Sequence, residues 1–104
     1  GTVSSDDHYT GTKAAAFGGT TTVIDFVPFE TPSLDESVEK WRRKAEKAAV
    51  DYAAHMNLTR FNANIAAEIP SLREKGITTL KVFTAYNGRL RIDDSSILQA
   101  MNIA

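Results

Sequence analysis

The stretch TTTVIDFVPF, residues Thr20–Phe29, is rich in β-branched residues and almost continuously apolar until Pro28 interrupts it. A run of this kind is typical of a strand in a parallel sheet, which is covered on both faces and therefore does not alternate between apolar and polar residues. Pro28 has no backbone N–H to donate to a neighbouring strand. We therefore predict a buried parallel strand over Thr20–Phe29.

Helical patterns flank this strand. Before it, Ser4 or Ser5 is a candidate N-cap for a helix over Asp6–Phe17, with acids in the first turn and Gly18 at its end. After it, Ser33 and Glu36 form a capping box. The apolar positions that follow recur at helical spacing and are Leu34, Val38, Trp41, Ala45 and Ala48. We expect the opposite face of this helix to be solvated; its charged residues are Glu39, Lys40, Arg43, Glu46 and Lys47.

The same rhythm continues to the end of the chain. We predict a strand over Val50–Leu58 and a helical segment from Asn62 to Gly76, broken near Pro70 because proline is tolerated only in a first turn. A strand over Thr78–Thr84 follows, with a turn at Asn87-Gly88. We expect a last helix from Asp93 with an apolar face, formed by Ile97, Leu98 and Met101.

This order, α-β-α-β-α-β-α, predicts an α/β protein with parallel strands and flanking helices. Residues 1–104 form one domain without a linker, of about three βα units, and the rhythm resembles part of a (β/α)8 barrel. Three strands are few for a closed parallel sheet. Because the chain opens on Gly1 and not on methionine, we expect a processed, tagged or excised segment.

The composition narrows the class of protein. Hydrophobic residues make up 42% of the chain, charged residues 24%, and the net charge is -1. This balance gives no indication of binding to nucleic acid or to an anionic membrane surface. The chain contains no cysteine and no apolar run of the roughly 20 residues that would span a bilayer. We expect a cytoplasmic protein.

Lys81 is the unusual residue of the last predicted strand, because it stands among Leu80, Val82 and Phe83. Burying an ammonium group costs several kcal/mol by order of magnitude unless the charge is paired. Three explanations remain open at this point: the side chain reaches an edge, it pairs with an acid, or it is chemically modified so that it is no longer a cation.

Other candidate groups give weaker signals. His8 and His55 lie in no metal-binding pattern, and we expect His8 to be solvated and His55 to be a hydrogen-bonded structural residue. Asp25 lies late in the first strand, where α/β proteins often place functional groups. The glycines of FGG and NGR match no phosphate-binding loop, so we interpret them as a helix cap and a turn.

Several blocks together resemble the hydantoinase and dihydropyrimidinase family of cyclic amidohydrolases. The resemblance covers the whole chain, through GTVSSDDHYTGTKAAAFGGTTTVIDFV, LDESVEKW, DYAAHM, KGITTLKVFTAYNG and IDDSSILQAM. It implies a segment of a metal-dependent hydrolase that opens the ring of hydantoins or dihydropyrimidines. It also implies a partial barrel of the (β/α)8 type.

The resemblance assigns roles to two residues. In the family, the lysine that matches Lys81 reacts with carbon dioxide to form a carbamate that bridges two metal ions, usually zinc. The tyrosine that matches Tyr86 donates a hydrogen bond to the oxyanion that develops on the substrate. Lys81 and Tyr86 are five residues apart and would face opposite sides of a regular strand, so the strand must end or bend before Tyr86 if both serve one site.

Two features depart from the family. Thr84 stands where methionine is common, and Leu80 where phenylalanine is common. The family's metal-binding histidines and catalytic aspartate match positions before Gly1 or after Ala104, and neither His8 nor His55 matches them. We therefore expect the isolated chain to be inactive. The alternatives are a non-enzymatic remnant that associates with itself, as a dimer or larger homo-oligomer, and a flavodoxin-like binding module suggested by element order alone.

Overall fold

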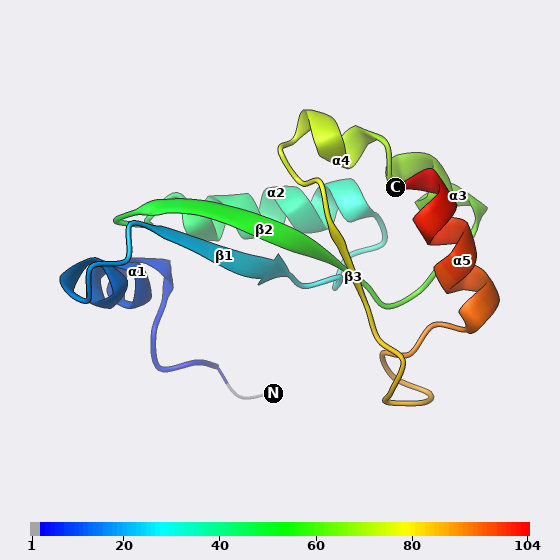
Figure 1. The fold of residues 1–104 in the computed structure, drawn as a ribbon, viewed down its shortest axis with the longest axis horizontal. Coiled ribbons are helices and arrows are strands. Elements are labelled where there is room, and N and C mark those ends of the chain that lie inside the picture. The colour runs from blue at the N-terminus through cyan, green and yellow to red at the C-terminus, as the bar shows by residue number, and fades with distance from the viewer. Residues whose placement is uncertain (1–2) are drawn as a thin grey trace.

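A computed structural model describes residues 3–104, and its centre is a parallel sheet. The strands β1 (Thr22–Val27), β2 (Asp51–Leu58) and β3 (Leu80–Val82) lie in the order β1-β2-β3 (Figure 1). The helices of the described residues are α1 (His8–Phe17), α2 (Leu34–Ala45), α3 (Ala63–Glu68), α4 (Ser71–Glu74) and α5 (Asp94–Ile103). The predicted α/β class and the parallel pairing are confirmed, but the prediction of a buried first strand is wrong, since Ile24 and Phe26 of β1 are exposed.

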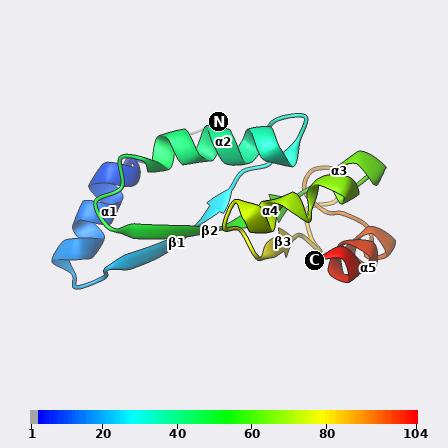
Figure 2. The same cartoon turned by 90° about the horizontal axis from the view of Figure 1, so that it is seen from above.

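The two faces of the sheet differ in what covers them. Alternate residues along each strand point to opposite faces. On the covered face, helices and loops bury Val27, Ala54, Met56 and Leu58. The other face, which we call the open face, carries Ile24, Phe26, His55, Asn57 and Lys81, and Ile24 is 60% exposed there. Helix α2 runs along one side of the sheet, while α5 lies beyond the end where β1 finishes (Figure 2).

The helix α2 supplies most of the cover because its sequence places apolar residues on one side. Its N-cap is Ser33, whose side chain accepts a hydrogen bond from the Glu36 N–H, as predicted. The buried side chains of this helix are Leu34, Ser37, Val38, Trp41 and Ala45. Ala48, which we predicted to continue this face, lies beyond the end of the helix.

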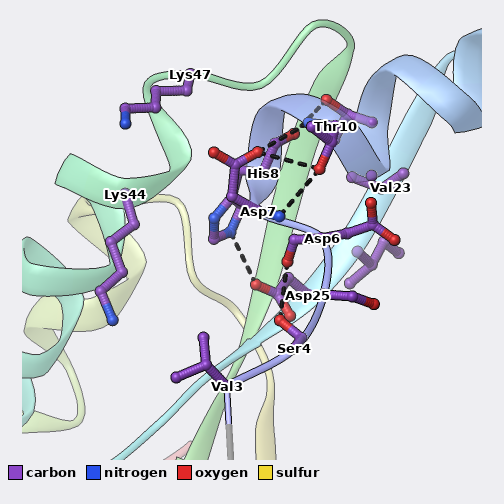
Figure 3. Close-up of a pocket in the computed structure, with 14 residues that line it drawn as sticks. Val3, Ser4, Asp6, Asp7, His8, Thr10, Val23, Asp25, Lys44 and Lys47 are labelled. Carbon is purple, nitrogen blue, oxygen red and sulfur yellow. Dashed lines mark hydrogen bonds and ion pairs between the residues drawn. The ribbon is translucent and has the colours of Figure 1, made fainter.

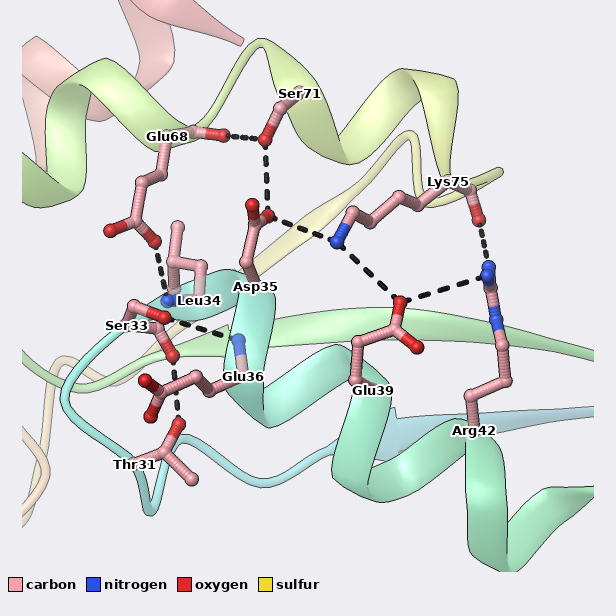
Figure 4. A network of polar contacts seen from close by, with 10 residues as sticks. All are labelled: Thr31, Ser33, Leu34, Asp35, Glu36, Glu39, Arg42, Glu68, Ser71 and Lys75. Carbon is pink, nitrogen blue, oxygen red and sulfur yellow. Dashed lines mark hydrogen bonds and ion pairs between the residues drawn. The ribbon is translucent and has the colours of Figure 1, made fainter.

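A polar network fixes the segment before β3 against α2 (Figure 4). The Lys75 amine lies 3.3 Å from a carboxylate oxygen of Asp35 and 3.5 Å from one of Glu39. The Arg42 guanidinium donates to the Lys75 carbonyl oxygen at 2.8 Å, and the Leu34 N–H donates to the Glu68 carboxylate at 2.6 Å. Because Lys75 ends α4, this network sets where β3 can begin.

Several local predictions are confirmed or corrected. The break at Pro70 is confirmed, since it separates α3 from α4. The predicted N-cap of α1, Ser4 or Ser5, is wrong. Asp7 caps this helix by accepting a hydrogen bond from the Thr10 N–H at 2.9 Å, so Asp6 and Asp7 precede the first turn. The strand predicted over Thr78–Thr84 is shorter, because the chain bends after Val82.

The predicted apolar face of α5 is correct at Ile97 and wrong at Leu98 and Met101. Ala100 is buried and Ile97 packs against the core, whereas Leu98 and Met101 are 60% and 70% exposed. The helix therefore docks through a small residue and one branched residue, and its larger side chains face solvent.

Candidate functional site

Lys81 lies at the carboxyl end of the sheet, one residue before β3 ends. Its amine is 4.2 Å from the centre of the Phe26 ring and 4.6 Å from the centre of the Phe83 ring. Aromatic faces attract an ammonium at these distances. Among residues 3–104, the structure shows no ion pair and no hydrogen bond to this amine. Of the three explanations for this lysine, pairing with an acid therefore finds no support within the described residues.

The neighbours of Lys81 come from β1 and β2. Asn57 is its register partner on β2, and His55 on the same face stacks against Phe26 with ring centres 5.4 Å apart. The His55 Nδ1 is hydrogen-bonded to the Thr79 hydroxyl, which confirms the prediction of a structural histidine. The open face near Lys81 therefore combines two aromatic rings, an imidazole and an amide.

Tyr86 lies in the loop that follows β3, and this loop reverses the chain. Tyr86 has a φ of 66°, in the left-handed region that residues with a side chain rarely adopt, and its carbonyl oxygen accepts from three backbone N–H groups, those of Arg89, Leu90 and Arg91. Its ring lies edge-on to the Phe83 ring with centres 6.2 Å apart. Phe83 thus contacts both Lys81 and Tyr86, and the condition that the strand end before Tyr86 is met. The side chain is 62% exposed.

A second cluster lies between α1, β1 and α2. The Asp25 carboxylate accepts a hydrogen bond from the Trp41 indole N–H at 2.8 Å, and the His8 Nε2 lies 3.1 Å from the same oxygen. His8 is only partly exposed, so the prediction that it is solvated is wrong. The cluster borders an open hollow of about 820 Å³, which is also lined by Asp6, Lys44 and Lys47 (Figure 3). Neither Lys81 nor Tyr86 lines it.

The pKa of Asp25 reflects this setting. Burial raises the pKa of the carboxyl group, but hydrogen bonds from Trp41, from the Phe26 N–H and from His8 outweigh burial and hold the pKa below its ordinary value of 3.8. The cluster needs an ionised Asp25 to anchor α1 and α2 to β1. We interpret it as structural, because its polar atoms are occupied by one another.

The Asp25→Asn variant is expected to test this anchor. A depressed folded pKa means that Asp25 stabilises the fold above its unfolded pKa and loses that contribution as pH falls through the folded value. Because the side chain is 43% exposed, we expect a loss of about 1 kcal/mol near pH 7, which shrinks as pH falls below the ordinary carboxyl pKa and through the lowered folded pKa. Urea unfolding at a series of pH values measures it. Asp6→Asn, in the same hollow, is the control, and an equal loss in both variants would contradict the anchor.

The described residues contain little else that could form a site. They hold no group of three or more His, Asp or Glu side chains able to bind a metal ion. They also contain no helix long and apolar enough to cross a membrane. Gly18 is the C-cap of α1 and Gly88 lies in a turn with a φ of 73°, as predicted for the FGG and NGR glycines.

Sequence reasoning singled out Lys81, Tyr86, Asp25, His8 and His55, and the structure distributes them over two places. Lys81, Tyr86 and His55 belong to the open face and its adjoining loop, while Asp25 and His8 meet near the start of α1. Asn57 and Phe26 were missed as neighbours of Lys81, whereas Phe83 was recognised from its place in the sequence. Only the pairing register of β2 with β3 reveals Asn57, and a sequence pattern does not contain that register.

Comparison with known proteins shows extensive similarity. The chain is 43% identical over 106 residues to a D-hydantoinase from Streptomyces coelicolor, covering 100% of this chain and 23% of the relative. It is 35% identical over 102 residues to a dihydropyrimidinase from Arabidopsis thaliana, covering 97% of this chain and 19% of the relative. A crystal structure of a dihydropyrimidinase from Brevibacillus agri superposes with a TM-score of 0.87 and 41% identity, over 99% of this chain and 24% of that one. No family model matches. The chain spans about a quarter or less of the length of these relatives.

Proposed function

Because this chain is homologous over its whole length to one segment of the D-hydantoinases and dihydropyrimidinases, we propose that it is part of a hydrolase acting on C–N bonds of cyclic amides. The single observation that carries the proposal is the position of Lys81. Its amine lies at the carboxyl end of a parallel strand, on the open face, and without an acidic partner among residues 3–104.

The fold supports a partial (β/α)8 barrel. In such barrels the strands are parallel, consecutive strands are neighbours, and the active site lies at their carboxyl ends. The three strands of this chain follow that order. The radius of gyration is 14.7 Å, larger than the roughly 13 Å of a compact domain of this length, which fits a slice of a larger body. We propose that the open face is the inner wall of the barrel.

The residues of this chain would supply only part of a binuclear metal site. A binuclear zinc site needs about four ligands for each ion. In this chain Lys81 is the one residue that we propose as a ligand, after conversion to a carbamate, and residues 3–104 hold no cluster of three further ligands. Residues outside 1–104 would supply the others. Bound metal would polarise the amide carbonyl and activate water.

Tyr86 is the proposed hydrogen-bond donor to the substrate. The loop after β3 exposes its side chain, and its ring packs on Phe83, whose ring also lies near the Lys81 amine. A phenol in this place donates to negative charge as it develops on the amide oxygen, which is the kind of interaction that lowers a hydrolytic barrier. The proposed substrates are hydantoins and dihydropyrimidines.

The isolated chain is the first test. Residues 1–104, purified with zinc and bicarbonate, are expected to bind less than one equivalent of metal and to leave hydantoin and dihydrouracil unhydrolysed, because one lysine cannot hold two ions. Metal analysis after dialysis and an assay of ring opening measure this. Stoichiometric zinc together with turnover would contradict the proposal that further ligands are needed.

We also propose that the isolated chain associates with itself. Within residues 3–104, the outer strands β1 and β3 each pair with another strand on one side only. Exposed apolar side chains occur on the open face at Ile24 and on α5 at Leu98 and Met101. Such edges and faces favour pairing between chains. Light scattering across a concentration series is expected to show a dimer or larger, and Ile24→Lys to shift it towards monomer. Val3→Lys is the control, and a wild-type chain that stays monomeric would refute self-association.

A further inference from the structure

Among residues 3–104, one buried side-chain oxygen has no hydrogen-bond partner. The Oδ1 of Asn57 is inaccessible to solvent and accepts no hydrogen bond from the described residues. A buried acceptor left unpaired costs roughly 1–3 kcal/mol, so native structures rarely keep one without a reason. Asn57 is on β2, the central strand, between Met56 and Leu58, which are fully buried on the covered face. The amide therefore lies on the open face.

The residue beside Asn57 on the next strand is Lys81, whose amine is a hydrogen-bond donor without an acceptor among residues 3–104. Asn57 and Lys81 are register partners of the parallel β2–β3 pair, so their side chains leave the sheet on the same face from strands roughly 4.8 Å apart. The Lys81 amine contacts the rings of Phe26 and Phe83, with no hydrogen bond within residues 3–104.

We propose that Asn57 is the positioning residue for Lys81: its Oδ1 accepts the one N–H that remains after Lys81 has become a carbamate. This inference rests on the proposed function, because that function requires the carbamate. In the reaction, the neutral amine forms an N–C bond to carbon dioxide, a C–O π pair moves to oxygen, and one amine proton is released to water. The product carries one N–H and a negative carboxylate group.

The match between one acceptor and one donor distinguishes the modified lysine from the unmodified one. An ammonium group has three N–H donors, and a single amide oxygen would leave two of them to the aromatic faces. A carbamate has one donor, which one amide oxygen satisfies. Aromatic faces carry negative charge and repel an anion. Holding the N–H on Asn57 directs the carboxylate group away from Phe26 and Phe83.

The test measures the carbamate itself and not activity. The chain is equilibrated with ¹³C-bicarbonate in mildly alkaline solution, and the carbamate is quantified by ¹³C NMR. The α-amino group of Gly1 also reacts with carbon dioxide, so the Lys81 signal is the resonance that is missing in Lys81→Arg. Asn57→Leu, similar in size but without an acceptor, is expected to lower the Lys81 carbamate equilibrium constant about fivefold, the factor that corresponds to one net hydrogen bond.

A second variant separates positioning from packing. Asn57→Asp keeps the shape of the side chain but places an anion beside the amine, which favours the ammonium form and repels the carbamate, so the Lys81 resonance is expected to disappear. Asn64→Leu, an exposed asparagine on α3, is the matched control and should leave the signal unchanged. Thermal unfolding checks that each variant folds. If Asn57→Leu does not fold, Asn57→Ala replaces it as the variant without an acceptor.

The outcomes are distinguishable. A Lys81 resonance in the wild type that is about fivefold weaker in Asn57→Leu supports the role of Asn57. An equal resonance in the two proteins overturns that role and leaves the proposed function intact. A wild type without any Lys81-dependent resonance overturns the positioning of a carbamate by Asn57, and it leaves the proposed function, whose other metal ligands are assigned to residues outside 1–104, to its own test.

Discussion

Replacing Leu58 by alanine is expected to lower the free energy of unfolding by about 2–5 kcal/mol. Leu58 is the last residue of the central strand and is fully buried in the core under the helices. Truncation removes apolar contacts and leaves a cavity that a strand paired on both sides cannot close by moving. Since a domain of this size is typically stable by only about 5–15 kcal/mol, this loss is a large fraction of the total stability. Urea unfolding followed by circular dichroism measures the loss.

The matched control is the same substitution at Leu98, which is 60% exposed on α5. Surface changes of this kind are usually within about 0.5 kcal/mol of neutral. If the two variants lost equal stability, the covered face of the sheet would not be the core on which this fold depends.

The parts of the fold that sequence reasoning predicted correctly are those encoded locally. Ser33, Asn62 and Asp93 each accept a backbone hydrogen bond from a residue three positions later, and each marks the start of a helix where the sequence places it. Pro70 breaks a helical pattern because its ring and missing N–H act on its own turn. Such signals are short-range, so the sequence carries them in full.

Two of the errors arise where a distant contact decides the outcome, whereas the wrong N-cap of α1 is a local error, because Asp7 and Thr10 are three residues apart. His8 was predicted to be solvated, yet the Asp25 carboxylate, 17 positions away in sequence, holds it beside Trp41. The wrong part of the α5 face has the same origin, because Ala100 and Ile97 meet the core and Leu98 and Met101 do not. Apolar content alone does not reveal which face a neighbouring element covers.

The candidate site shows the same division. Lys81 was recognisable in the sequence because a cation in an apolar strand demands an explanation. Its surroundings were not: Phe26 lies on β1 and Asn57 on β2, and only the parallel register brings them to one place. Because Lys81 and Tyr86 are five residues apart, the sequence required the strand to end or bend before Tyr86 if both residues serve one site. The short β3, which ends at Val82, meets this condition, and Tyr86 then packs against Phe83.

The largest effects are expected at Tyr86 and Lys81 in a chimera in which residues 1–104 replace the matching segment of the Streptomyces coelicolor D-hydantoinase. We expect the chimera to bind zinc and hydrolyse hydantoin. Tyr86→Phe removes the proposed donor to the developing oxyanion and is expected to lower kcat about 10²–10³-fold, the range found for loss of one such donor. Because phenylalanine has the same backbone constraints, the φ of 66° is no easier or harder to adopt.

Lys81→Ala in this chimera is expected to abolish both activity and stoichiometric zinc binding, because it removes a proposed metal ligand. Tyr86→Phe should leave the zinc content unchanged, because it removes only a proposed contact to the substrate. Metal analysis beside the kinetics separates the two. Tyr52→Phe is the control for loss of a phenol, since this ring packs against Trp41 on the covered side. Retention of full zinc and turnover in Lys81→Ala would refute the role of this lysine, because no other residue of the open face offers an equivalent anion.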